Sequence, residues 1–300
     1  MLQYNYDGFE IYEYSPTQNE KIEKALFFAH ANGVPAQTYR ALFEKMALQF
    51  NWLIVTYDMR GFGKTKAKAK LIKDNSSDWT WDLLIQDHIA VFQKVKEQKN
   101  KNISWLLGGH SLGAWLALLS ANRLKIDDLI LLDPAILPPK ILWKWSFISF
   151  LKMKHLSPMG KRVKKRKIKF PSEEIALTEY KKSSFMQKWS DESIRDYIKG
   201  SFLEQENEIH LSHDPKWEAM MFEEYPALAT IAFLKIPFQT RKKIRPLFFV
   251  GELSDTCYPN AEKWVKLFFP NLKWILIPEG KHMFPIEMPD LLIQIIQDHS

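Results

Sequence analysis

The chain has 300 residues, of which 46% are hydrophobic, enough to bury the core of one large α/β domain or of two small ones. Its formal net charge of +7 slightly favours anionic partners but identifies none. The single cysteine, Cys257, excludes an intramolecular disulfide and a thiolate metal cluster.

Short apolar runs alternate with amphipathic segments along most of the chain. This alternation is typical of βαβ units, so we expect an α/β fold with a mainly parallel sheet flanked by helices. The predicted strands are 9–14, 25–29, 52–57, 103–107, 129–132, 247–250 and 274–277. The predicted helices between and after them are 39–49, 83–97, 114–124, 261–268 and 286–297.

One long interval, 138–241, breaks this alternation. It has no convincing strand pattern and contains helix-like pieces at 141–154, 172–182, 191–205 and 216–224. Because the predicted strands 129–132 and 247–250 flank it, we interpret it as a helical cap inserted between them, which the resemblance described below makes the sixth and seventh strands of the sheet. The predicted domains are therefore a core, 1–137 and 242–300, and a cap, 138–241.

The sequence Gly-His-Ser-Leu-Gly at 109–113 follows the predicted strand 103–107 and precedes the predicted helix 114–124. Gly-x-Ser-x-Gly in this context is the pattern of a nucleophile elbow. Glycines at both ends permit a turn so tight that its central side chain projects above the sheet. We therefore predict that Ser111 is a catalytic nucleophile.

A serine nucleophile needs a general base and an acid that orients it. Among the eight histidines, His282 follows the last predicted strand, at the edge of the sheet where ligands collect in parallel α/β folds. We predict His282 as the base. Asp255 also follows a strand and is the preferred acid, with Asp133 as its rival and Glu252 as a third candidate.

The reaction also needs backbone N–H groups that stabilise an oxyanion. The N–H of Leu112, directly after the nucleophile, is the first predicted donor. The second is expected in the loop His-Ala-Asn-Gly-Val-Pro at 30–35, after the strand 25–29. Gly33 can adopt unusual backbone angles, which favours the N–H of Val34 as that donor.

Taken together, these motifs resemble the α/β-hydrolase fold superfamily, whose serine–acid–histidine order matches Ser111, Asp255 and His282. Thr65 stands where that superfamily usually has serine, at the end of its Asp-x-Arg-Gly-x-Gly-x-Ser turn. The segments that carry the resemblance are 30–35, 57–65, 109–113 and 280–289.

The resemblance covers both flanks of the insertion and implies the α/β-hydrolase sheet with a lid after its sixth strand. Relatives that open epoxides or remove halides carry aspartate in place of Ser111, so we expect neither activity. We predict instead a serine hydrolase of hydrophobic carboxylic esters that needs no cofactor or metal. Acyl transfer or thioester hydrolysis on the same triad stays open, as does a non-catalytic ligand-binding role.

Two features of the cap bear on partners and location. Aromatic and apolar residues crowd 142–151, and a basic run occupies 161–169, which together suggest transient contact with an anionic membrane surface. No recognition motif supports nucleic-acid binding.

Because 1–7 does not resemble a signal peptide and no apolar run spans a bilayer, we expect a soluble, cytoplasmic protein. The sequence leaves the oligomeric state open.

Overall fold

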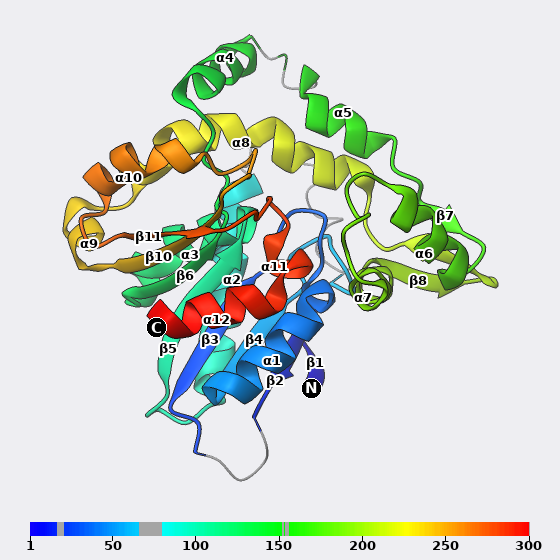
Figure 1. The fold of residues 1–300 in the computed structure, drawn as a ribbon, viewed down its shortest axis with the longest axis horizontal. Helices are drawn as coiled ribbons and strands as arrows, with labels where there is room; N and C mark the ends of the chain where they lie inside the picture. The colour runs from blue at the N-terminus through cyan, green and yellow to red at the C-terminus, as the bar shows by residue number, and fades with distance from the viewer. Residues whose placement is uncertain (17–20, 66–79, 152, 154–155, 300) are drawn as a thin grey trace.

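The computed structural model describes residues 1–16, 21–65, 80–151, 153 and 156–299, and it contains a twisted sheet between helical layers (Figure 1). Within these residues eight strands form the main sheet, in the order β1-β2-β4-β3-β5-β6-β10-β11. From β4 to β11 neighbouring strands are parallel, whereas β2 pairs antiparallel with both β1 and β4. The strands are β1 (Leu2–Tyr6), β2 (Phe9–Tyr14), β3 (Lys24–Ala29), β4 (Trp52–Tyr57), β5 (Ser104–His110), β6 (Asp128–Leu132), β10 (Arg245–Gly251) and β11 (Lys273–Ile277).

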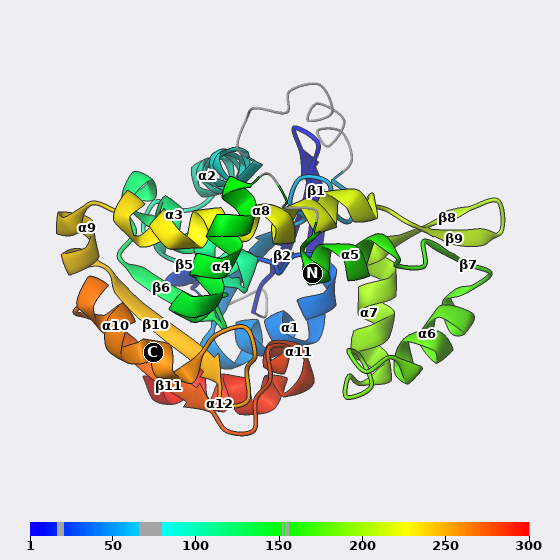
Figure 2. The ribbon, with the colours of Figure 1, turned by 90° about the horizontal axis from the view of Figure 1, so that it is seen from above.

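Helices cover both faces of this sheet because its buried strands are apolar on both sides. On β3, Phe27 contacts Phe92 of α2, while the next residue, Phe28, contacts Phe43 of α1. Successive side chains of a strand point to opposite faces, so α1 and α2 lie on opposite sides (Figure 2). The helices of the core are α1 (Arg40–Phe50), α2 (Thr80–Glu97), α3 (Leu112–Leu124), α10 (Glu262–Phe268), α11 (Phe284–Glu287) and α12 (Pro289–His299).

The edge strand β1 is absent from the sequence prediction. Among the described strands it pairs with β2 alone, and its residues are exposed or half-buried. A strand covered on one side needs no continuous apolar run, which explains the weak signal.

The segment between β6 and β10 lies across one end of the sheet (Figure 1). Its helices are α4 (Pro139–Phe150), α5 (Pro158–Lys164), α6 (Glu173–Lys182), α7 (Asp191–Ser201), α8 (Pro215–Lys235) and α9 (Phe238–Lys243). The prediction that this interval contains no strand is wrong, because β7 (Lys169–Phe170), β8 (Phe202–Gln205) and β9 (Glu208–Leu211) form a small sheet. Glu206 and Asn207 adopt positive φ in the turn of the β8–β9 hairpin, and strands this short leave no periodic pattern.

One buried histidine of the core makes stability depend on pH. His88 of α2 is fully buried, packs on Phe27 and lies with Nδ1 3.0 Å from the Tyr57 hydroxyl. Burial lowers its pKa to about 3, whereas an unfolded chain's histidine titrates near 6.5. Below pH 6.5 the unfolded state therefore binds a proton that the folded state does not, and stability falls as the pH falls.

We expect this histidine to contribute about 2 kcal/mol to the loss of unfolding free energy between pH 7 and pH 5. In urea titrations at both pH values, His88→Leu should therefore lose less stability than the wild type. The exposed His299→Gln serves as a matched control that keeps the wild-type loss. Equal losses in wild type and His88→Leu would show that His88 does not stay neutral in the folded protein.

Candidate active site

The strand–turn–helix predicted around Ser111 is present between β5 and α3. Ser111 has φ 55° and ψ −112°, a backbone conformation that residues other than glycine rarely adopt. A Cβ on Gly109 would lie 2.2 Å from the carbonyl carbon of Gly113, and one on Gly113 would lie 2.0 Å from the Ala29 carbonyl oxygen. Only glycine fits at both positions, so the two glycines allow the turn that places Ser111 at the end of β5.

Three side chains from distant parts of the chain meet at this turn. The Ser111 hydroxyl lies 3.1 Å from Nε2 of His282, in the loop after β11. Nδ1 of the same ring lies 2.6 Å from Oδ2 of Asp133, which directly follows β6. The Asp133 carboxylate is fully buried, whereas the His282 side chain is 21% exposed. Nucleophile, base and orienting carboxylate therefore form one hydrogen-bonded chain.

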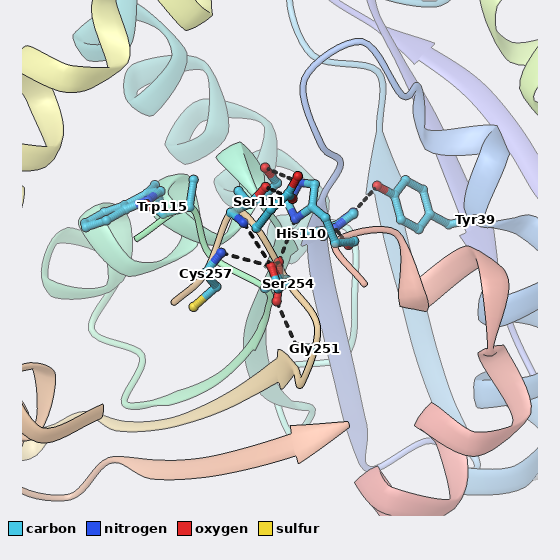
Figure 3. A network of polar contacts seen from close by, with 12 residues as sticks. Tyr39, His110, Ser111, Trp115, Gly251, Ser254 and Cys257 are labelled. Atoms are coloured by element: carbon cyan, nitrogen blue, oxygen red, sulfur yellow. Dashed lines mark hydrogen bonds and ion pairs between the residues drawn. The ribbon is translucent and has the colours of Figure 1, made fainter. Parts of the chain in front are cut away.

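The predicted pairing of Asp255 with His282 is wrong, and its rival Asp133 occupies that position. Asp255 is exposed, and among the described residues its carboxylate accepts a hydrogen bond only from the Thr256 hydroxyl. The inward-facing residue of this loop is its neighbour Ser254, whose hydroxyl donates to Asp133 (Figure 3). The Ser254 oxygen in turn accepts the N–H of Cys257, which fixes the loop in this orientation.

Asp133 is held in place by the neighbouring strand β10. Its own N–H donates to the Phe249 carbonyl of β10, and its Oδ1 accepts the N–H of Gly251. Its φ of 41° turns the chain sharply after β6. Glu252, the third candidate acid, is exposed and accepts the N–H of Glu279 instead.

His110, the second residue of the elbow motif, has a role that the sequence did not predict. Its Nε2 donates to the carbonyl of His282 at 2.9 Å, since a carbonyl can only accept. Its Nδ1 therefore accepts from the Tyr39 hydroxyl at 2.7 Å, and the Tyr39 oxygen accepts the N–H of Ala31 (Figure 3). Burial holds the pKa of His110 well below its usual range, so the ring stays neutral and links the backbone of His282 to the loop after β3.

The prediction that Val34 donates to an oxyanion also needs correction. Its N–H donates to the Ala31 carbonyl at 3.2 Å and closes a turn. In the same loop, the backbone N–H groups of Asn32 and Gly33 have no acceptor among the described residues, and Asn32 is the nearer of the two to His30 in sequence. The loop lies beside the elbow, since a Cβ on Gly113 would come within 2.6 Å of the His30 carbonyl oxygen. Asn32 thus replaces Val34 as the candidate second donor. The first candidate donor, the N–H of Leu112, lies at the start of α3, where backbone N–H groups have no partner within the helix.

The inserted segment fixes this loop from the other side. The Asn32 side-chain amide donates to the backbone carbonyl of Glu218 in α8, and a Cβ on Gly33 would lie 2.2 Å from the Glu218 carboxylate. That buried carboxylate is itself bonded to Arg166 and to His213. The loop is therefore anchored between the elbow and α8.

The Asp-x-Arg-Gly turn after β4 has a structural role. Asp58 is fully buried and accepts the backbone N–H groups of Ala36 and Lys64. Burial raises its pKa to about 6 despite these bonds. Arg60 forms a buried ion pair with Asp87 at 2.6 Å. These contacts join the turn to the neighbouring loop and to α2.

Two observations on the described residues concern metal binding and membrane insertion. No group of three or more His, Cys, Asp or Glu side chains there is placed to hold a metal ion. None of the helices that the structure describes is long and apolar enough to cross a membrane.

The family model described as serine aminopeptidase, S33, matches residues 20–207, more than half of the chain. The chain belongs to this family of α/β-hydrolases. It is accordingly an α/β-hydrolase enzyme, as the motifs predicted. No curated protein matches its sequence.

Solved structures share the fold of this S33-family chain at low sequence identity. The peroxisomal α/β-hydrolase Lpx1 from Saccharomyces cerevisiae is 16% identical, with a TM-score of 0.72 over 97% of this chain and 80% of that one. A thioesterase domain from the curacin biosynthetic pathway is 15% identical, with a TM-score of 0.68 over 99% and 98%. A thermophilic esterase from Thermogutta terrifontis is 17% identical, with a TM-score of 0.57 over 97% and 92%. At these identities the likeness concerns the fold alone.

Proposed function

We propose that this chain hydrolyses carboxylic esters with hydrophobic acyl groups, through a triad of Ser111, His282 and Asp133. The observation that carries the proposal is the hydrogen-bonded chain of these residues, with distances of 3.1 and 2.6 Å. The hydrogen-bonded chain is complete with Asp133 in the position predicted for Asp255, which favours catalysis over the non-catalytic alternative.

In this mechanism the Ser111 oxygen attacks the ester carbonyl carbon while Nε2 of His282 takes its proton. Asp133 holds Nδ1–H and stabilises the imidazolium that forms. The N–H groups of Leu112 and Asn32 stabilise the oxyanion of the tetrahedral intermediate. His282 then gives the proton to the leaving alcohol, and the intermediate collapses to an acyl-enzyme on Ser111. His282 next takes a proton from a water molecule that attacks this acyl group and returns the proton to the Ser111 oxygen, so that the carboxylic acid leaves and the free serine is restored.

Apolar packing beside the elbow supports a hydrophobic substrate. Leu112, which follows the nucleophile, and Trp217 and Met221 of α8 are all buried apolar residues of the large core cluster on this face of the sheet. We infer that the segment 138–241 acts as a cap and that an acyl chain lies between it and the elbow. The cytoplasmic location stays a prediction.

A chain-length series tests this function. We expect purified protein to hydrolyse p-nitrophenyl esters, with kcat/KM rising from acetate to a medium-chain acyl group, because each buried methylene adds about 0.8 kcal/mol of transfer free energy. Aminoacyl p-nitroanilides, which the family description suggests as substrates, serve as the comparison. Preferential turnover of these amides, or no turnover of any ester, would contradict the proposal, whereas faster acyl release with an added alcohol or thiol would favour acyl transfer.

A further inference from the structure

One face of α4 leaves large apolar side chains in solvent. Trp143 is 77% exposed, Phe147 is 63% exposed, and Leu151, just after the helix, is 48% exposed. These residues are spaced by four, and the N–H of Leu151 donates to the Phe147 carbonyl, so the three share one helical stripe. A monomeric soluble protein rarely exposes a contiguous patch of this kind unless something binds there.

Exposed basic side chains lie on α4 itself and on α5, the next helix along α8. Lys140 and Lys144 fall on the same side of α4 by helical spacing, and Lys161, Arg162 and Lys165 belong to or follow α5. All five are exposed, and none has an ion-pair partner within the part of the chain that the structure describes. In contrast, the neighbouring Lys164 and Lys167 are paired with Glu223 and Glu179. The five free cations therefore lack internal compensation.

The position of α4 and α5 leaves this face accessible. Both helices pack against α8, and both lie on its outer side, away from the sheet (Figures 1 and 2). The apolar stripe and the cations are thus outside the elements that build the elbow. Binding at this face needs no rearrangement of Ser111, His282 or Asp133.

We propose that this face binds the surface of an anionic lipid membrane. Trp143, Phe147 and Leu151 enter the interface between headgroups and acyl chains, where an amphipathic helix with an aromatic residue is stable. The five cations contact lipid phosphates and anionic headgroups. Membrane binding explains the apolar and the basic residues together, whereas a nucleic acid would account for the charges and leave Phe147 and Leu151 without a role.

The test is sedimentation of the full chain with phosphatidylcholine vesicles, with and without phosphatidylserine, at low and high salt. We expect binding to be about ten-fold stronger with phosphatidylserine and to weaken as salt rises, because surface charge attraction is screened. Two sets of substitutions should each reduce binding about ten-fold. One set is Trp143→Ser with Phe147→Ser and Leu151→Ser, and the other is Lys140→Gln, Lys144→Gln, Lys161→Gln, Arg162→Gln and Lys165→Gln.

Matched controls remove exposed residues of the same kinds elsewhere. Leu48→Ser with Leu267→Ser, and Lys125→Gln with Lys263→Gln, should bind vesicles as the wild type does. Binding that survives both test sets would overturn the proposal. The proposal would equally be overturned if binding depended on the cations alone and if soluble heparin or DNA bound the same cations. That result would assign the face to a polyanion. This experiment measures vesicle binding and not turnover, so failure of the membrane proposal would leave the proposed ester hydrolysis unaffected.

Discussion

Asp133→Asn is expected to lower kcat for ester hydrolysis by about 10⁴-fold, the loss known when a triad carboxylate becomes an amide. The amide at this position can donate to Nδ1 of His282 and thereby stabilise the wrong tautomer, in which Nε2 carries the proton and no longer accepts from Ser111. Loss of the buried negative charge also removes stabilisation of the imidazolium. KM should change far less, because Asp133 is buried behind the ring.

The matched control is Asp255→Asn, which removes the acid that the sequence alone favoured. Since Asp255 is exposed and bonded only to Thr256 within the described residues, we expect kcat to stay within about two-fold of the wild type, as for most surface substitutions. Steady-state kinetics on one p-nitrophenyl ester, with thermal unfolding of both variants, decides between the two carboxylates. A large loss in Asp255→Asn with full activity in Asp133→Asn would refute the triad described here.

Ser111→Ala is expected to cause the largest loss, about 10⁵- to 10⁶-fold in kcat, since removal of the nucleophile removes the acyl-enzyme route. The fold should persist, because alanine keeps the Cβ already present at this backbone position. The buried Ser120→Ala in α3, whose hydroxyl bonds to the Ala117 carbonyl, is a matched control and should keep its turnover. Pre-steady-state kinetics with the ester in excess should show a burst of p-nitrophenol in the wild type and in Ser120→Ala, and none in Ser111→Ala. Turnover in Ser111→Ala at the wild-type rate would assign the reaction to another residue.

The sequence predicted the core well where its signals are local. The segments 9–14 and 52–57 coincide with β2 and β4. The first alternates apolar and polar residues, as a half-buried strand does, and the second is an almost continuous apolar run, as in a strand covered on both faces. The elbow was predictable for a similar reason, since steric clashes demand Gly109 and Gly113. His282 stood out because it follows the last strand of the sheet.

The errors concern contacts between distant loops. Whether Asp133 or Asp255 faces His282 depends on the conformation of the loop after β10, and the hydrogen bond from Ser254 to Asp133 stabilises that conformation. No periodicity encodes such a bond. The neighbouring order of β5 and β6 would have favoured Asp133, but strand order emerges only from the sheet. Val34 was predicted as a donor because it follows Gly33. Its N–H instead closes a turn by donating to the Ala31 carbonyl, and the presence of a glycine at position 33 does not reveal that bond.

The most direct test of a catalytic Ser111 activated by His282 and Asp133 is covalent labelling with an alkyl fluorophosphonate, followed by peptide mass spectrometry. We expect one phosphonyl group, bonded to Ser111. It should form at the wild-type rate in Asp255→Asn and much more slowly in Asp133→Asn. A label on any other residue, or equal labelling rates in Asp133→Asn and the wild type, would contradict it.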